Sequence, residues 1–192
     1  AGELAAVICI SDPLRAEAKD AIRALHACGI SKVVMMTGDN RRTAASVAEE
    51  VGVDEFYAEV LPEDKAAFIR REKAAGRTVI MIGDGVNDSP ALSEADAGVA
   101  ISTGAAIARE IADITIASED LFELVTLRRI SEALMGRIHR NYRFIVGFNL
   151  GLIVFGVAGL LPPTTSALLH NASTLAISLK SMTNLLPGKK KI

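Results

Sequence analysis

The first two thirds of the chain alternate between apolar runs and stretches in which apolar residues recur at helical spacing. Apolar runs are typical of buried strands, and the spaced stretches are typical of amphipathic helices. Strands that alternate with helices of this length predict an α/β fold, a parallel sheet with helices on both faces. Strands are predicted over residues 4–10, 32–39, 55–60, 78–85, 98–102 and 113–117, and helices over residues 15–29, 41–53, 62–76 and 89–97.

The pattern changes after residue 127. A polar, basic connecting helix is predicted over residues 128–143, and it leads into residues 144–161, where Asn149 is the single polar side chain. An uncharged run of this length predicts a transmembrane helix. Pro162 and Pro163 break the run, and residues 164–186 then form a second, more polar predicted transmembrane helix that must pack against other helices.

Basic residues flank this predicted hairpin. Arginines within residues 128–143 precede the first span, and three lysines in the tail 187–192 follow the second. Because positive residues mark the cytoplasmic side, we expect both ends of the hairpin inside and the Pro-Pro turn outside. Residues 1–127 are then cytoplasmic, and the chain is in contact with the lipid bilayer. The alternative is that both helices are core helices of a soluble protein.

Composition changes this picture in two respects. The formal net charge of -2 gives no broad basic field, so we expect no nucleic-acid partner. Cys9 and Cys28 form no C-x-x-C pattern, and we expect both to be reduced core residues of an intracellular domain. The chain begins with Ala1 rather than Met, as expected of a fragment or a processed product.

The predicted strand 78–85 ends in a polar loop, within the sequence VIMIGDGVNDSPAL. Asp84, Asn87 and Asp88 lie within five positions, and Gly85 allows the backbone to double back between them. Acidic and amide groups this close together repel one another or remain unsatisfied unless a cation lies among them. The loop therefore predicts a Mg²⁺ site that draws in phosphate oxygens.

Two further polar features lie at corresponding places. Thr37, Gly38 and Asp39 end the predicted strand 32–39, and Lys65 opens a predicted helix. Ligands of parallel sheets lie beyond the carboxyl ends of the strands, so these features are expected near the polar loop. The Thr37 hydroxyl and nearby N–H groups can hold a phosphoryl oxygen, and Lys65 can offset its charge. Singly, such a turn and such a lysine are commonplace, and only the ordered set is specific.

The stretches MMTGDN, LPEDK and MIGDGVNDSPAL resemble the second half of the phosphorylation domain of P-type ATPases, which are ion pumps with a haloacid-dehalogenase-like core. SDPLR, at residues 11–15, resembles the hinge between that domain and the nucleotide-binding domain. The two helices that follow, the second containing HNASTLAISLKSMTNLL, most resemble the heavy-metal-transporting branch. The resemblance covers nearly the whole chain. It implies the C-terminal part of an ATP-driven heavy-metal cation pump in the plasma (inner) membrane.

The resemblance also implies roles for individual residues. Mg²⁺ and ATP are the implied cofactors, with ATP bound mostly by a domain outside this chain. The implied residues are Asp84 and Asp88 for Mg²⁺, Thr37, Asp39, Lys65 and Asn87 for phosphoryl transfer, and Asp12, Arg15, Gly38 and Gly85 for cofactor binding.

Parts of the family pattern are missing from the chain. The D-K-T-G-T motif that supplies the nucleophilic aspartate does not occur. Asp12 follows a predicted strand but has Leu14 where a second aspartate is expected, so Asp12 is not expected to replace that nucleophile. The implied partners are therefore the rest of the pump polypeptide, with its actuator and nucleotide-binding domains and earlier helices. The isolated chain is expected to be inactive.

The transported metal cation is left unidentified by the sequence. Neutral oxygen donors on the two predicted spans form a possible ion site, and interhelical hydrogen bonding is their alternative role. These donors are Asn149, Asn171, Ser173 and Thr174, whereas His170 is expected near the outer interface. Two other interpretations of the whole chain stay open: a soluble phosphatase of the dehalogenase-like class, and a non-catalytic membrane regulator with the same fold.

Overall fold

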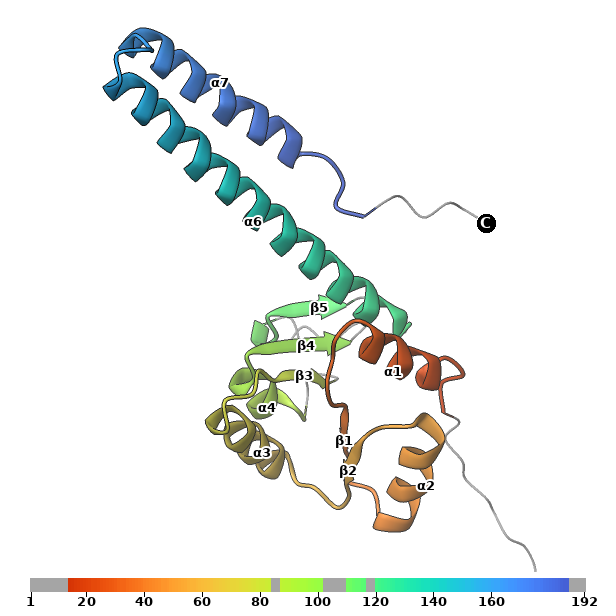
Figure 1. Ribbon diagram of the computed structural model, residues 1–192. Helices are drawn as coiled ribbons and strands as arrows, with labels where there is room; N and C mark the ends of the chain where they lie inside the picture. The colour runs from red at the N-terminus through yellow and green to blue at the C-terminus, as the bar shows by residue number, and fades with distance from the viewer. Residues whose placement is uncertain (1–13, 84–86, 102–109, 117–119, 187–192) are drawn as a thin grey trace, which may run out of the picture. The chain divides into compact units, whose positions relative to one another are not determined.

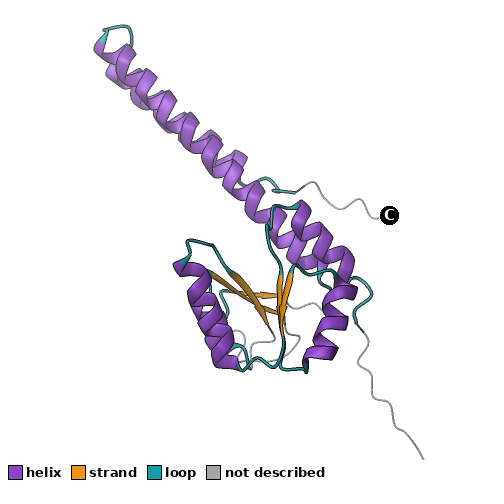
Figure 2. Ribbon diagram, turned by 60° about the horizontal axis from the view of Figure 1, so that its bottom comes forward, coloured by secondary structure: helices purple, strands orange, loops and turns teal. Residues whose placement is uncertain are grey.

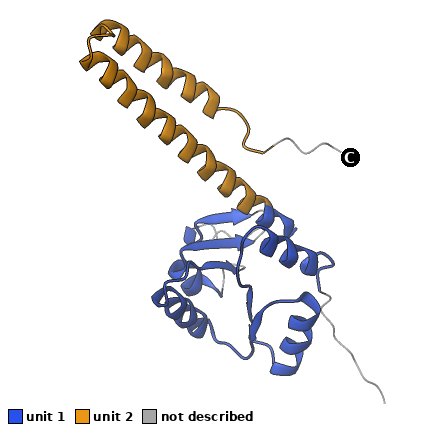
Figure 3. Cartoon of the chain, viewed as in Figure 1, with its two compact units in different colours: residues 1–125 blue, residues 126–192 orange. Residues whose placement is uncertain are grey.

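The computed structural model describes residues 14–83, 87–101, 110–116 and 120–186. The chain divides into two compact units, residues 1–125 and residues 126–192 (Figure 3). The predicted strand 4–10 lies outside the described residues, as do Asp12, Asp84 and Gly85.

The first unit alternates helices and strands, and each of its described elements falls on a stretch that the pattern predicts (Figure 1). The strands of this unit lie between helices on either side (Figure 2). The elements are α1 (Ala18–Ala27), β1 (Val34–Met36), α2 (Arg41–Val51), β2 (Glu55–Tyr57), α3 (Pro62–Ala74), β3 (Ile80–Gly83), α4 (Ser89–Glu94), β4 (Ala97–Ile101) and β5 (Ile114–Ile116).

All described strand pairs are parallel, which confirms the α/β class. β1 pairs with β2, and β3, β4 and β5 form a second sheet in that order. The described strands therefore form two sheets rather than the single predicted one. In the part of the chain that the structure describes, β3 pairs on one side only, and its side chains Ile80 and Ile82 are exposed.

Local signals place the starts of α2 and α3. Asn40 caps α2, because its Oδ1 accepts a hydrogen bond of 3.0 Å from the N–H of Thr43. α3 begins at Pro62, and the Asp64 carboxylate accepts a bond of 3.1 Å from the N–H of Leu61. Proline suits the first helical position, where its missing N–H is not needed. This start puts Lys65 in the first turn of α3.

The core of the first unit consists of small and aliphatic side chains. α4 lies so close to β4 that a Cβ at Gly98 would be 2.7 Å from the backbone oxygen of Leu92. This contact leaves no space for a side chain at position 98. The buried apolar residues of the elements around it are Ala66, Ile69, Ala91, Leu92, Val99 and Ala100.

The second unit is a helical hairpin. α6 (Phe122–Val157) starts in the first unit and runs unbroken through residue 143, the predicted end of the connecting helix, and α7 (Pro163–Ser181) follows. α6 ends before the proline pair, because Gly159 has a φ of +73° and the N–H of Leu160 bonds to the oxygen of Phe155 at 2.9 Å. This is a left-handed glycine cap.

No helix in the described stretches is both long enough and apolar enough to cross a membrane. Neither predicted span, 144–161 or 164–186, is confirmed. The physical reason for the first is its boundary: the last four residues of the apolar run lie beyond the end of α6 at Val157. α7 likewise ends at Ser181.

Candidate functional site

Lys65 and Asp88 form an ion pair beside the end of β3. Nζ of Lys65 lies 2.7 Å from Oδ1 of Asp88, and the two side chains are only 16% and 12% exposed. The two residues come from different motifs, 23 positions apart in the chain. A pair this well shielded from water is held more strongly than an ion pair on the surface.

Gly83 is the last residue of β3, and the Asp88 side chain covers it. A Cβ at position 83 would lie 2.8 Å from the Cβ of Asp88 and 3.0 Å from its Cγ. The sequence G-D-G-V-N-D thus needs its first glycine for space rather than for backbone freedom. Asn87, next to Asp88, is exposed.

The helices that carry the pair are held together by charged contacts. Nζ of Lys73, at the end of α3, lies 2.7 Å from the backbone oxygen of Glu94 and 3.3 Å from Oδ1 of Asp96. Oδ2 of Asp96 accepts a 2.8 Å hydrogen bond from the N–H of Val79, just before β3. This hydrogen bond, with help from Lys73, lowers the pKa of Asp96. α3, α4 and β3 therefore form one connected support for Lys65.

Thr37, Gly38 and Asp39 form a tight turn directly after β1. The Thr37 hydroxyl donates to Oδ2 of Asp39 at 2.8 Å and accepts from the Asp39 N–H at 3.1 Å. The backbone oxygen of Thr37 accepts a 3.0 Å bond from the N–H of Val60, which lies just ahead of α3. The turn after β1 is thus bonded to the chain segment that leads to Lys65.

Oxygen donors of the Asp88 loop suit a hard divalent cation. Asp88 is buried, and its carboxylate faces the end of β3. In the described residues, which leave out Asp84, no three acidic, histidine or cysteine side chains group as metal ligands. The predicted Mg²⁺ ligand set of Asp84 and Asp88 thus stays a prediction.

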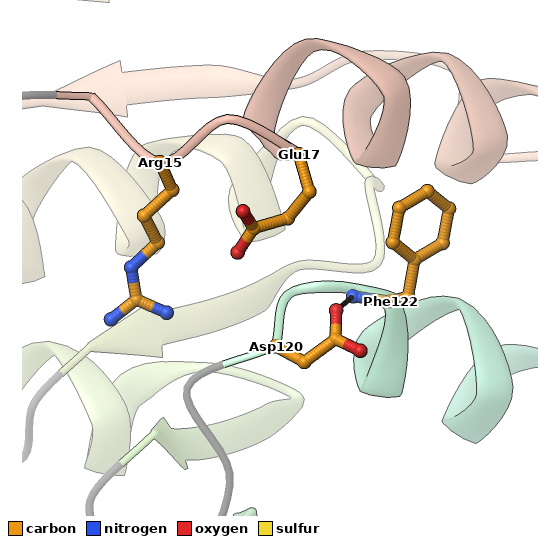
Figure 4. A pocket seen from close by; sticks show the side chains of 4 residues that line it. All are labelled: Arg15, Glu17, Asp120 and Phe122. Carbon is orange, nitrogen blue, oxygen red and sulfur yellow. Dashed lines mark hydrogen bonds between the residues drawn. The ribbon is translucent and has the colours of Figure 1, made fainter.

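Arg15 lines a hollow of about 590 Å³, together with Glu17, Asp120 and Phe122. Figure 4 shows the Arg15, Glu17 and Asp120 side chains around this hollow, with Asp120 accepting a hydrogen bond from the N–H of Phe122 at 2.9 Å. Two acidic side chains beside one arginine do not make an anion site. The predicted nucleotide role of Arg15 therefore depends on groups outside these four.

A second polar cluster lies in the hairpin of α6 and α7. Nδ1 of His170 lies 2.9 Å from Oδ1 of Asn149, so Nδ1–H is the donor. In the neutral imidazole, this arrangement leaves the lone pair on Nε2. Asn149, His170 and Asn171 line a groove of about 700 Å³ whose other walls are mostly apolar. Asn149 and Asn171 were predicted as donors to an ion, whereas His170 was predicted near the outer interface.

Ser173 and Thr174 are used differently from the asparagines. Both hydroxyls donate to the backbone oxygen of His170, at 2.8 Å and 3.0 Å. Neither residue lines the groove. Helical serines and threonines often bond to the preceding turn in this way. Their hydroxyl protons are used in hydrogen bonds within α7. His170 and Asn171 of α7 line the groove with Asn149.

Comparison with known proteins gives three kinds of match. Residues 1–96 match the family model described as haloacid dehalogenase-like hydrolase. The chain is 46% identical over 168 residues to copper-transporting ATPase 2 of Rhizobium meliloti (strain 1021), a match that covers 88% of this chain and 20% of that protein. It is 41% identical over 177 residues to the manganese-exporting P-type ATPase of Mycobacterium bovis (strain ATCC BAA-935 / AF2122/97), covering 92% of this chain and 25% of that protein.

Solved structures agree with these matches. A crystal structure of a zinc-transporting PIB-type ATPase in the E2.Pi state is similar with a TM-score of 0.82 and 33% identity, over 89% of this chain and 28% of that chain. The catalytic CPx-ATPase domain CopB-B matches with a TM-score of 0.56 and 37% identity, over 62% of this chain and 47% of that chain.

The chain spans about a fifth to a quarter of the length of the curated relatives described above. The family match covers its first half, and the relatives' matches extend over most of the rest. The chain belongs to the haloacid dehalogenase-like hydrolase family and corresponds to one segment of the heavy-metal-transporting P-type ATPases.

Proposed function

We propose that the chain is the C-terminal part of an ATP-driven heavy-metal cation pump that works through an aspartyl-phosphate. Residues 1–127 are part of its phosphorylation domain, residues 128–143 the connecting helix, and residues 187–192 a basic cytoplasmic tail. The buried Lys65–Asp88 pair carries this proposal, because it joins two of the three resembling motifs beside the end of β3. The ATPase relatives support it.

Each polar residue of the first unit has a defined task in this proposal. Asp88 holds the Lys65 ammonium in place, and Lys65 offsets charge on the phosphoryl group. Thr37 turns its hydroxyl from Asp39 to a phosphoryl oxygen, while the N–H groups of the turn stay oriented.

Mg²⁺ and ATP are the proposed cofactors. Asp84 and Asp88 hold Mg²⁺ with support from Asn87, and the ion supplies Lewis-acid stabilisation of phosphoryl oxygens when bound. ATP contacts Asp39, Gly38, Gly85 and the segment of Asp12 and Arg15, with most of its binding surface on another domain.

The nucleophilic aspartate comes from the rest of the pump polypeptide. The one-sided pairing of β3 in the described residues is compatible with a further strand from that polypeptide. The test is labelling with ATP that carries γ-phosphate label. We expect acid-stable label on the full-length protein, less label after Lys65→Met, and none on the isolated chain. Label on the isolated chain would show a nucleophile within residues 1–192 and would refute the proposal that the nucleophile comes from the rest of the pump polypeptide.

We also propose that the hairpin lies in the lipid bilayer of the plasma (inner) membrane, packed against helices from the rest of the pump. Val146, Leu150 and Val154 are exposed at spacings of four residues and do not line the groove of about 700 Å³, so they form one outward apolar stripe on α6. Leu152, between them, is buried. An apolar exterior around an inner polar pair is the arrangement expected of membrane helices.

The topology of this hairpin is tested with single cysteines in a background without other reactive thiols. We expect Leu161→Cys to react with an impermeant maleimide in intact cells, because the turn is outside. Asn184→Cys should react only after permeabilisation. Equal labelling of both cysteines in intact cells would contradict the proposed topology.

The transported cation is proposed to bind at the groove of Asn149, His170 and Asn171. None of the described residues that line this groove contains sulfur. Cu⁺ prefers thiolate and thioether ligands, whereas an imidazole nitrogen with amide oxygens suits a divalent cation such as Mn²⁺ or Zn²⁺. The hydrogen bond from Nδ1–H to Asn149 orients the His170 ring and leaves Nε2 to ligate the cation. Ser173 and Thr174 contribute their oxygen lone pairs at most as outer support.

The test of this site is metal-stimulated ATP hydrolysis by the full-length protein. We expect stimulation by Mn²⁺ or Zn²⁺ and its loss in His170→Ala, with phosphorylation from ATP retained at saturating metal. Ser178→Ala is the matched control, because its hydroxyl donates to the backbone of Thr174 on the same helix. Stimulation by Cu⁺ alone, unaffected by His170→Ala, would refute the assignment.

A further inference from the structure

Arg137 on α6 binds the C-terminal end of α7. Its Nη1 donates to the backbone oxygens of Ser181 and Thr183, at 2.8 Å and 2.6 Å, and its Nη2 donates to that of Asn184 at 3.0 Å. The last carbonyl groups of a helix have no partners within the helix and carry its negative dipole end. A guanidinium group is suited to them, because its planar fork donates several hydrogen bonds in fixed directions.

Asn141 adds a second contact one turn further along α6. Its Nδ2 donates to the Ser181 hydroxyl at 2.9 Å. Arg137 and Asn141 are both half-buried, and they share a helix face with the buried Leu152. The contacts to residues 181–184 therefore lie on the seam between α6 and α7.

The Arg137 contacts and the Asn149–His170 pair define the same register of the hairpin. Asn149 lies twelve residues after Arg137 on α6, and His170 lies eleven residues before Ser181 on α7. In antiparallel helices, equal steps along both chains keep partners opposite each other. A slip of α7 by one turn moves His170 about 5.4 Å along the axis, beyond hydrogen-bond reach of Asn149.

We propose that Arg137 is a positioning residue, which fixes the register of α6 and α7 so that Asn149 orients His170. This role rests on the proposed cation site of the pump. The apolar side chains elsewhere on the seam tolerate sliding, because dispersion contacts are not directional. Directional hydrogen bonds to three carbonyls select one register. Arg137 thereby acts on cation binding without touching the cation.

The experiment measures the register and cation binding separately in the full-length protein. Spin labels at Leu150→Cys and Leu179→Cys, two exposed positions on different helices, report axial displacement. We expect one distance in the parent protein and, in Arg137→Gln, a second population displaced by about 5 Å. The cation concentration for half-maximal ATPase stimulation should rise by the inverse of the native-register fraction, about tenfold if that fraction falls to about one tenth.

Arg140→Gln is the matched control, because it removes the same charge from an exposed position three residues away. It should change neither the distance nor the cation concentration. Arg137→Lys keeps the charge but cannot bridge three carbonyls, and we expect an intermediate result; it takes the place of Arg137→Gln if that variant does not fold. An unchanged single distance in the Arg137 variants overturns the proposal. A parent protein with no cation-stimulated ATPase refutes the pump function instead, while the distances still test the register.

Discussion

The Lys65–Asp88 pair allows a quantitative prediction about phosphoryl transfer. Lys65→Met keeps the length of the side chain and removes the ammonium that lies 2.7 Å from Oδ1 of Asp88. The variant leaves a carboxylate that is 12% exposed without its cation. It also removes the charge that we propose offsets the phosphoryl oxygens.

The magnitude follows from the distance and the burial. At an effective dielectric constant of about 20, two charges at this separation attract by about 6 kcal/mol before desolvation is subtracted. Removal of one partner of a buried pair costs about 3–5 kcal/mol, and the residual exposure of this pair favours the lower end. A loss of about 3 kcal/mol, if expressed in the transition state, slows phosphoenzyme formation roughly 150-fold.

The assay is the rate of phosphoenzyme formation in the full-length protein for Lys65→Met, Asp88→Asn and the double variant. Because the two groups act as one unit, the double variant should be no more than about threefold slower than the slower single variant. Arg71→Met is the control: it removes the same charge from the same helix, at a side chain that is 64% exposed. Multiplied losses in the double variant, or an equal loss at Arg71, would refute the reasoning.

Three further predictions concern other features of the first unit. Gly83→Ala should lower stability by about 1–3 kcal/mol in denaturant unfolding, because its Cβ meets Asp88, whereas Gly147→Ala, with open space around it, should not. The hydrogen bond from the Val79 N–H lowers the pKa of Asp96 below its ordinary value of 3.8. The ionised carboxylate therefore stabilises the fold at pH values above 3.8, and this stabilisation is lost as the pH falls through the lowered pKa. Asp96→Asn should therefore differ from the parent in unfolding midpoint at pH 7, and the difference should shrink as the pH falls below 3.8. The isolated chain should bind ATP far more weakly than the full-length protein in equilibrium titration.

The order of helices and strands in the first unit was predictable, because apolar runs and helical spacing are local signals. The pairing of Lys65 with Asp88 was not, since the residues lie 23 positions apart and only the packing of α3 against α4 brings them together. The sequence indicated a common site for both motifs, but not this direct contact. Gly83 was missed as a site residue, although a glycine at the end of a buried strand often marks a close approach.

The hairpin was predicted less well than the first unit. Hydropathy placed the end of the first helix at residue 161, whereas the positive φ of Gly159 allows a cap that ends α6 at Val157. The glycine signal was present in the sequence but was outweighed by the proline pair. His170 was missed as a partner of Asn149, because their contact depends on the register of two helices. That register is set by backbone carbonyls, which no side-chain pattern reveals.

The one-sided pairing of β3 also has a consequence for work with the chain on its own. Among the described residues β3 has no partner strand on its second side, and such an edge, with exposed Ile80 and Ile82, is a template for adding a strand. In concentrated solution the isolated chain should therefore self-associate through this edge wherever residues 4–10, the predicted strand outside the described residues, do not occupy it. A short β-strand peptide that pairs with β3 should cap the edge and restore the monomer, and it would make the chain an acceptor for fragment complementation.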